Sequence, residues 1–332
     1  MKILVTGGAG FIGSNFIRHI IKKYPAYKII NLDKLTYCGN LDNLRDIEKS
    51  PNYTFVKGDI CDKRIVEQLM SKADTVVHFA AETHVDRSIM DAGSFIQTDV
   101  FGTYVLLEAA RKNNIQKFVH ISTDEVYGEI HEGAFKETDE LIPRNPYSAS
   151  KAAADRLAYS FFATYSLPIS ITRSSNNFGP HQYPEKLIPL FVTNLFEGKK
   201  VPLYGDGLNV RDWLYVLDNC EAIDLILHQG ALGEVYNIAA GNETTNLEIT
   251  KLILQELDKD ESYIEHVKDR LGHDKRYALD CSKIKKLGWK PKYEFEEALK
   301  DTVTWYTVNK LWWQKLKNSQ FEEYYKKQYK VK

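Results

Sequence analysis

Short apolar runs alternate with longer amphipathic stretches through the first half of the chain. The apolar runs are rich in β-branched residues and predict strands, which cover residues 2–6, 27–32, 53–57, 75–79, 117–122 and 169–173. The stretches between them carry apolar residues at helical spacing and predict helices, for example over residues 12–23, 64–71 and 94–113. Strands separated by helices are typical of βαβ units, so we expect an α/β fold with a doubly wound parallel sheet of the Rossmann type.

This pattern changes after about residue 178. Pro180, Pro184 and Pro189 interrupt it, and the later segments are shorter and more mixed. We therefore predict a dinucleotide-binding domain over residues 1–178 and a smaller α+β substrate-binding domain over residues 179–332. Segments within about 205–240 are expected to return to the first domain.

Composition excludes several classes of partner. The 332 residues are 43% hydrophobic with a formal net charge of -1, so no global field would recruit nucleic acid or an anionic membrane. The four cysteines lack C-x-x-C spacing, so we expect reduced thiols, no metal site and a cytoplasmic location. No apolar run approaches the roughly 18 residues of a membrane helix. The N-terminal residues also lack the pattern of a signal peptide.

A glycine motif follows the first predicted strand. Gly8, Gly10 and Gly13 form G-x-G-x-x-G between that strand and a helix, where glycines allow a tight turn and a close approach to a pyrophosphate. Asp33 stands 20 residues after Gly13, at the end of the second strand. A carboxylate there accepts hydrogen bonds from the adenosine ribose and repels the extra phosphate of NADP, so NAD is the expected cofactor. The alternative is a glycine turn in an unrelated α/β fold, with Asp33 a surface acid.

Tyr147 and Lys151 lie four residues apart, directly after Pro146. At the start of a helix this spacing places both side chains on one face, where the lysine stabilises the phenolate and the tyrosine acts as a base. The alternative is an exposed amphipathic helix. Together with the glycine motif, the pair resembles the short-chain dehydrogenase/reductase superfamily over the first half of the chain.

Two adjacent carboxylates, Asp124 and Glu125, follow the strand over residues 117–122. The carboxyl end of a strand is where such folds assemble their chemistry. Paired carboxylates are costly beside a bound diphosphate unless they act in the reaction. The alternative is a solvated loop or an acidic pair at a helix N-terminus.

The segment around these carboxylates, Ser-Thr-Asp-Glu-Val-Tyr-Gly over residues 122–128, is similar to the dTDP-glucose 4,6-dehydratases. So is Ala-Ala-Glu-Thr-His-Val-Asp-Arg-Ser over residues 80–88. Further matching segments run almost end to end, over residues 35–40, 95–98, 175–180, 184–189, 211–216, 269–274 and 287–289.

That resemblance implies a reaction in three stages. Tyr147, supported by Lys151 and Thr123, removes the proton of the C4 hydroxyl while C4 gives hydride to NAD+. Glu125 then takes the C5 proton, which the new ketone has made acidic, and Asp124 gives a proton to the departing C6 hydroxyl. Hydride finally returns to C6 as C5 is reprotonated. The two carboxyls must therefore differ in protonation.

The same resemblance implies the binding residues. The NAD set is Gly7, Gly10, Phe11, Ile12, Gly13, Asp33, Lys34, Leu35, Thr36, Asp59, Ile60, Ala80, Ala81, Thr98, Tyr147, Lys151 and Asn177. The substrate set is Thr83, His84, Thr123, Asn176, Glu185, Lys186, Leu187, Pro202, Tyr204, Arg211, Asn246, Arg270 and His273. Arg211 suits a bidentate diphosphate contact, and Tyr204 is expected to abut the nucleobase.

Three positions depart from the family pattern. Thr83 stands where a serine is usual, Phe178 where a tyrosine is usual, and Leu271 where a proline is usual. None is a proposed acid or base, but together they leave the choice between thymidine and uridine open.

Other activities stay open at this point. One alternative is a UDP-glucose 4,6-dehydratase or a sugar-nucleotide 4-epimerase, and an epimerase has no need of the Asp124–Glu125 pair. A non-catalytic NAD-sensing protein is a third. The resemblance also implies a homodimer, through the aromatic-rich segments 95–107 and 159–165, for which the alternative is ordinary core packing.

Overall fold

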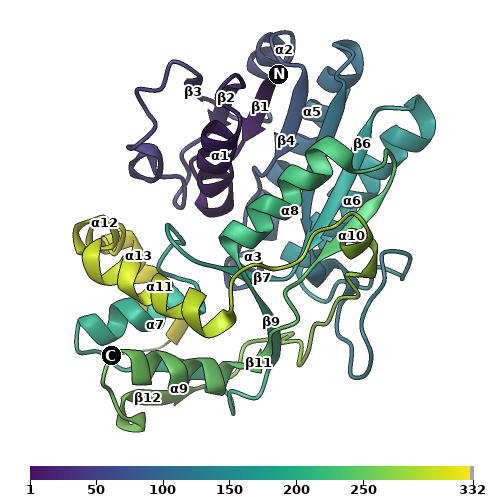
Figure 1. Cartoon of the computed structure of the whole chain (residues 1–332). Helices are drawn as coiled ribbons and strands as arrows, with labels where there is room; N and C mark the ends of the chain where they lie inside the picture. The colour runs from purple at the N-terminus through teal and green to yellow at the C-terminus, as the bar shows by residue number, and fades with distance from the viewer. Residues whose placement is uncertain (330–332) are drawn as a thin grey trace.

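The computed structural model of the chain describes residues 1–329. Its largest sheet has seven parallel strands in the order β10-β6-β5-β4-β1-β2-β3 (Figure 1). The strands are β1 (Lys2–Thr6), β2 (Lys28–Asp33), β3 (Tyr53–Lys57), β4 (Thr75–His78), β5 (Lys117–Thr123), β6 (Ile169–Ser174) and β10 (Val235–Ile238). The first six agree with the predicted strands to within one residue at each end. The strand order reverses between β1 and β4, which is the switch point where such sheets bind their ligands.

Both faces of this sheet are covered by helices. Alternate residues of β1 point to opposite faces, so that Ile3 and Val5 join one core and Leu4 joins another. The Ile3 face packs under α1 (Phe11–Lys23) and α8 (Val216–Gln229). The Leu4 face packs under α2 (Lys63–Met70), α5 (Thr103–Lys112) and α6 (Pro146–Tyr165). The expected doubly wound Rossmann-type fold is therefore confirmed.

The predicted helix over residues 94–113 has a π-helical centre. It comprises α4 (Ala92–Phe95), the π-helix η2 (Ile96–Gly102) and α5. Asp99 in η2 is buried and accepts hydrogen bonds from the Glu82 amide at 2.7 Å and the Ser150 hydroxyl at 2.6 Å. Through Asp99, the π-helical turn is thus hydrogen-bonded both to the loop after β4 and to α6.

Beside the large sheet and its two core layers lies a second region with a hydrophobic core of its own, called the second core below. Its three-stranded sheet has the order β11-β9-β7, and β12 pairs in parallel with β8. These strands are β7 (Asn176–Phe178), β8 (Val201–Tyr204), β9 (Val210–Tyr215), β11 (Glu243–Thr245) and β12 (Ile264–Val267). The main helices are α7 (Leu187–Phe196), α9 (Asn246–Glu256), α11 (Phe295–Val308), α12 (Lys310–Leu316) and α13 (Ser319–Tyr329). Aromatic side chains including Phe191, Trp213 and Trp313 fill the space between them.

Short elements complete the described chain. They are η1 (Leu41–Leu44), α3 (Val85–Met90), η3 (Asp124–Tyr127), η4 (Glu261–Tyr263) and α10 (Ser282–Lys286). Within the region expected to return to the first domain, α8 and β10 pack with the large sheet, whereas β9 belongs to the small one. The division of the chain at residue 178 stays a prediction, and residues 330–332 of the second predicted domain lie outside the described residues.

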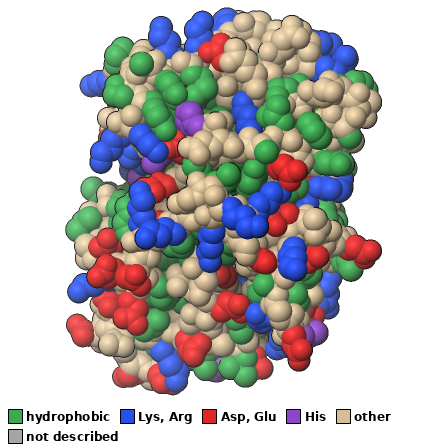
Figure 2. All heavy atoms as spheres, turned by 45° about the vertical axis from the view of Figure 1, so that its right-hand side comes forward, with side chains coloured by type: hydrophobic (Ala, Val, Ile, Leu, Met, Phe, Trp, Pro, Cys, Tyr) green, Lys and Arg blue, Asp and Glu red, His purple; other side chains and the backbone are tan. Residues whose placement is uncertain are grey.

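The surface carries charges of both signs. Figure 2 shows lysine, arginine, aspartate and glutamate side chains interspersed on one face, in keeping with the net charge of -1. Between residues 1 and 329, no helix has the length and apolar character needed to cross a membrane. The four cysteines are free thiols.

A buried ion pair joins β6 to α6. Arg173 donates from Nε and from a terminal nitrogen to the Asp155 carboxylate, at 2.8 and 2.9 Å, and both side chains are essentially inaccessible to solvent. Burial by itself raises the pKa of Asp155, but the hydrogen bonds and charge of Arg173 outweigh it, and the net shift is downward.

We predict that Asp155→Asn lowers the stability of the fold by about 3–5 kcal/mol, because it leaves the Arg173 guanidinium buried without a counter-charge. Urea unfolding of the purified protein measures this as a lower midpoint. Asp46→Asn is the control, since it breaks the exposed Arg18–Asp46 pair and should cost at most about 1 kcal/mol. Equal shifts for the two variants would contradict the prediction.

Candidate active site

The glycine turn links β1 to α1. Gly7 has a φ of +72°, and a Cβ there would lie 2.5 Å from the Ala80 amide nitrogen. A Cβ on Gly13 would lie 2.4 Å from the Gly7 carbonyl oxygen. Both positions therefore need glycine for the turn itself. A Cβ on Gly10 would meet only the Gly7 carbonyl oxygen, at 3.3 Å, and Gly10 leaves the backbone open to a ligand.

Asp33 ends β2 beside this turn and is 8% exposed. Its carboxylate accepts the backbone N–H groups of Ala9, at 2.9 Å, and Leu35, at 2.8 Å. Burial raises its pKa, and these two hydrogen bonds act in the opposite direction. The neighbouring Lys34 pairs with Asp59 at 2.7 Å. The ammonium group is thus already neutralised, which disfavours its use for an additional phosphate.

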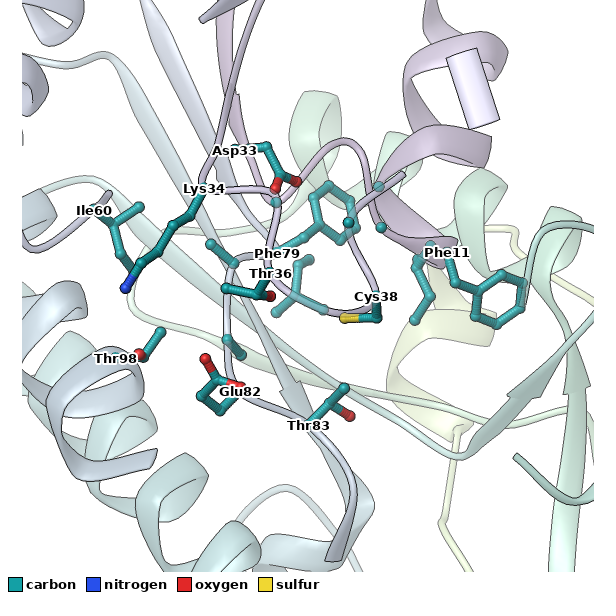
Figure 3. A pocket seen from close by; sticks show the side chains of 18 of the residues that line it. Phe11, Asp33, Lys34, Thr36, Cys38, Ile60, Phe79, Glu82, Thr83 and Thr98 are labelled. Atoms are coloured by element: carbon teal, nitrogen blue, oxygen red, sulfur yellow. The ribbon is translucent and has the colours of Figure 1, made fainter. Parts of the chain in front are cut away.

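A first cavity of about 230 Å³ opens beside the turn and Asp33. Figure 3 shows Lys34, Ile60 and Thr98 on one side of it and Phe11 on the other, with Cys38 between. Fifteen residues of the expected NAD set line it: Gly7, Gly10, Phe11, Ile12, Gly13, Asp33, Lys34, Thr36, Asp59, Ile60, Ala80, Ala81, Thr98, Tyr147 and Lys151.

The other two members of that set do not line the first cavity. Leu35 contributes its amide to Asp33, while Asn177 donates to the Ser175 carbonyl and accepts a hydrogen bond from Asn219. Ten lining residues were missed from the sequence: Leu32, Cys38, Gly39, Gly58, Phe79, Glu82, Ile121, Ser122, Gln182 and Tyr183. Phe79 and Ser122 could have been found, because they lie at the carboxyl ends of β4 and β5.

Tyr147 and Lys151 occupy the first turns of α6. Asn145 caps this helix and Pro146 is its first residue, so these two residues set the start of the helix. The positions of Tyr147 and Lys151 on the helix follow from that start. Lys151 donates from Nζ to the Ile121 carbonyl at 2.7 Å. Burial lowers the pKa of Lys151 and raises that of Tyr147 well above its usual value, with the charges of Glu125 and Asp99 adding to the second shift. The phenol is therefore protonated in the protein alone, and its action as a base stays a prediction.

The adjacent carboxyls lie where β5 runs into η3. The Thr123 hydroxyl donates to one oxygen of Asp124 at 3.1 Å and accepts the Glu125 amide at 3.3 Å. The second oxygen of Asp124 and one oxygen of Glu125 are buried and have no hydrogen-bond partner among the described residues. Groups placed in this way are available to a ligand.

The environments of the two carboxyls differ. Burial and then the charge of Glu125 raise the pKa of Asp124 to about 8, so this carboxyl stays protonated at neutral pH. Burial also raises the pKa of Glu125, but Arg270, Lys186 and Arg211 act against it. One carboxyl is thus poised as an acid while cations favour the charged form of the other.

A second cavity, of about 160 Å³, lies against Glu125. Eleven residues of the expected substrate set line it: His84, Asn176, Glu185, Lys186, Leu187, Pro202, Tyr204, Arg211, Asn246, Arg270 and His273. Thr83 lines the first cavity instead, and Thr123 lines neither. Aromatic residues missed from the sequence, Phe191, Trp213, Tyr277 and Tyr329, also face it, as does Asp86.

The second cavity suits an anion. Lys186, Arg211 and Arg270 line it, together with the first residues of α7 and α9. The Arg211 guanidinium donates to the Val210, Lys275 and Asp274 carbonyls, which leaves two of its five donors for a ligand. The buried Arg270 Nε has no partner among residues 1–329.

The two cavities adjoin at Tyr147, Glu185 and Lys186, which line both. The Glu185 carboxylate is held in place, because it accepts hydrogen bonds from the Tyr37 hydroxyl at 2.7 Å and from Arg87 Nε at 2.9 Å. A dinucleotide in the first cavity and an anionic substrate in the second would therefore meet at the Tyr147 phenol, with Glu125 alongside.

The fold and this arrangement define the class of the protein. A Rossmann-type sheet with a tyrosine and a lysine one helical turn apart, extended by a second core, is an extended short-chain dehydrogenase/reductase. Residues 4–302 match the family model described as GDP-mannose 4,6 dehydratase.

Comparison with individual relatives identifies the family within this class. A protein of Streptomyces antibioticus named dTDP-glucose 4,6-dehydratase is 52% identical over 323 residues, covering 96% of each chain. The low-salt glycan biosynthesis protein Agl12 of Haloferax volcanii is 54% identical over 306 residues, which cover 92% of this chain and 98% of that one. The crystal structure of a dTDP-glucose 4,6-dehydratase from Streptomyces venezuelae, with NAD bound, has a TM-score of 0.94 and 49% identity, covering 95% of this chain and 100% of that one. The chain belongs to the dTDP-glucose 4,6-dehydratase family.

We predict that Glu125→Gln lowers the pKa of Asp124 below about 8, because it removes the neighbouring charge while leaving the carboxyl buried. Infrared spectra recorded across the pH range follow the protonated carboxyl band, which Asp124→Asn identifies by its loss. An unchanged midpoint in Glu125→Gln would show that the two carboxyls are not coupled.

Proposed function

We propose that this chain is an NAD-dependent lyase that converts dTDP-glucose to dTDP-4-keto-6-deoxyglucose by loss of water across C5 and C6. The observation that carries the proposal is the meeting of the two cavities at Tyr147, with Glu125 lining the second one. Asp124 lines neither cavity but directly precedes Glu125 in the chain. Family membership supports the same reaction.

The residues around the first cavity fit NAD. Gly10 opens the backbone toward a pyrophosphate at the N-terminus of α1, and Asp33 has oxygen lone pairs left for a ribose after its two backbone contacts. The fifteen lining residues of the expected set would hold the cofactor, while Leu35 and Asn177 would support their neighbours. When bound, NAD+ accepts hydride from C4 and later supplies it to C6.

The first proton moves at Tyr147. Its phenol faces both cavities, so it can take the C4 hydroxyl proton as a ketone forms at C4. Lys151 would favour the phenolate by its positive charge. Thr123 lowers the pKa of Tyr147 when its hydroxyl donates to the phenol oxygen instead of to Asp124. The positive charge of an oxidised nicotinamide ring would favour it further.

Water is then eliminated by the two carboxyls. Glu125 lines the second cavity and carries an unpartnered oxygen, which removes the C5 proton made acidic by the C4 ketone. Asp124, protonated at neutral pH, donates its proton to the C6 hydroxyl, which leaves as water. Glu125 returns the proton to C5 as C6 is reduced.

The second cavity receives the sugar nucleotide. Lys186, Arg211 and Arg270 would neutralise the diphosphate, while Asn176 and Asn246 supply neutral polar contacts. Pro202 and Tyr204 would form one wall for the nucleobase. Three further residues of the expected substrate set, His84, Leu187 and His273, complete the lining of the second cavity. Glu185 and Thr83 lie at the boundary with the first cavity. Thr123 lines neither cavity and acts through Tyr147 and Asp124.

Asp124 separates this proposal from a 4-epimerase, because an epimerase needs no acid at C6. The choice between a thymidine and a uridine nucleotide rests on one methyl group, worth only about 1–3 kcal/mol. The presence of Tyr147 at the junction of the cavities, with Lys151 in the first one, speaks against a non-catalytic NAD-sensing protein. The cytoplasmic location stays a prediction.

We predict that the purified protein turns dTDP-glucose into a product about 18 mass units lighter, which is the mass of one water, without added NAD. Asp124→Asn and Glu125→Gln should each lower kcat about 10²- to 10⁴-fold, because each removes a general acid or base.

In the wild type, kcat should fall as the pH rises through about 8, where Asp124 loses its proton. Mass spectrometry and a pH–rate profile measure these effects.

Parallel incubations with UDP-glucose decide the nucleotide preference. A product of unchanged mass with inverted C4 would show that the protein is an epimerase and not a dehydratase. Asp124 and Glu125 would then not have the roles proposed here.

We further propose that the chain forms a homodimer through the outer face of α3, η2, α5 and α6. Large apolar side chains are exposed there on neighbouring helices: Ile89, Met90, Ile96, Phe101, Tyr104, Tyr159 and Tyr165. An exposed apolar face of this kind is typical of a protein interface.

We predict that Phe101→Glu yields monomers, because the charge would be buried at the interface. Light scattering after size-exclusion chromatography measures the mass. Leu311→Glu on α12 is the control, since Leu311 is exposed on a different helix and its replacement should leave the dimer intact. Wild-type protein that runs as a monomer would overturn the proposal.

A further inference from the structure

The C-terminal helix α13 reaches the second cavity, although no sequence motif marks it. Its last described residue, Tyr329, lines that cavity beside Pro202 and Tyr204, whose segment the proposed function assigns to the nucleobase. The rings of Tyr329 and Tyr204 lie 5.6 Å apart at an interplanar angle of 33°. Tyr329 therefore forms an adjacent wall rather than the opposite side of a slot, because a base could not fit between two rings at that distance.

A chain of hydrogen bonds fixes the end of α13 to the cavity. Gln328 donates from Nε2 to the Tyr204 hydroxyl at 2.7 Å, and that hydroxyl donates to Asp86 at 3.1 Å. Asp86 is 4% exposed and its other oxygen has no hydrogen-bond partner within residues 1–329. This oxygen lies 4.0 Å from the Arg270 guanidinium, beyond hydrogen-bond distance. It is therefore still an acceptor near the two rings, as the ring N–H of a pyrimidine dione requires.

A second anchor lies one helical turn earlier. The Arg87 guanidinium stacks between the rings of Tyr37, at 3.7 Å, and Tyr324, at 4.4 Å, and pairs with Glu185. Tyr324 also meets the His84 ring edge-on, at 5.9 Å. The loop after β2, the start of α3 and the loop before α7 thus all hold α13 in one position against the cavity.

We infer that Tyr329 is a specificity-determining residue, whose ring closes the side of the second cavity that receives the pyrimidine base of a nucleoside diphosphate. The inference rests on the proposed function, since it takes a nucleotide sugar as the ligand. Gln328 is a positioning residue, because it acts through Tyr204. Loss of the Tyr329 ring removes no charged group from the second cavity, so it should weaken nucleotide binding and leave diphosphate recognition intact.

Titration calorimetry of the NAD-loaded full chain tests this with two probes, dTDP and inorganic pyrophosphate, which has no base. We expect Tyr329→Ala to weaken dTDP binding about tenfold, within the range typical of one base–aromatic contact. Pyrophosphate binding should not change. Tyr329→Phe keeps the ring and should bind dTDP within about twofold of the wild type, as should Lys327→Ala on the same turn. In turnover, Tyr329→Ala should raise KM with kcat unchanged.

Three results would overturn the inference. Unchanged dTDP binding in Tyr329→Ala would show that the ring does not contact the nucleoside, and tighter binding would show that it obstructs the cavity. An equal loss for pyrophosphate would show a structural role only. Should Tyr329→Ala fail to fold, Tyr329→Leu keeps apolar packing without a ring and replaces it. If the wild type binds dTDP but does not dehydrate dTDP-glucose, the proposed function alone is wrong. If the wild type binds no dTDP, both the proposed function and the inference about Tyr329 are wrong.

Discussion

The whole site depends on the reversal of strand order between β1 and β4. On either side of this point the parallel strands end at the same edge of the sheet, where residues at or just after the ends of β1, β2, β4 and β5 line the first cavity. Strand β1 leads into the glycine turn, β2 ends at Asp33, and β5 ends at Thr123 beside the paired carboxyls. The binding and catalytic residues come from segments that are far apart in the sequence, so the sheet's geometry brings them together.

Burial governs the chemistry at this edge. Asp124 keeps its proton at neutral pH because it is out of solvent and beside Glu125, while nearby cations act on Glu125 in the opposite direction. The same burial raises the pKa of Tyr147, against the effect expected of Lys151 from the sequence. The lysine's hydrogen bond to the Ile121 carbonyl indicates that its first task is to fix the geometry of α6 on β5. Formation of the Tyr147 phenolate would thus require positive charge from bound ligands as well as from the chain.

Much of this could be predicted from the sequence where a local pattern has a single structural meaning. The six predicted strands and the glycine turn are of this kind, because apolar periodicity and glycine geometry act over a few residues. The carboxyl pair was located by the same logic, at the end of β5. Contacts between distant segments carry no such signal. The pairing of Lys34 with Asp59, the π-helical turn at Asp99 and the approach of Tyr329 to Tyr204 all arise from packing.

The path of the chain through the two sheets has a consequence for how the molecule folds. After β6 the chain enters the small sheet as β7 and β9, returns to the large sheet as β10, and leaves again as β11. Neither sheet can be completed from one continuous stretch of sequence, so the last strand of each must await contacts made far away along the chain. Such non-local order is slow to form. We therefore expect the two sheets to fold together as one cooperative unit. A fragment containing only the glycine turn and the Tyr147 helix would lack β10 at the sheet's edge, and we would not expect it to fold as a stable module.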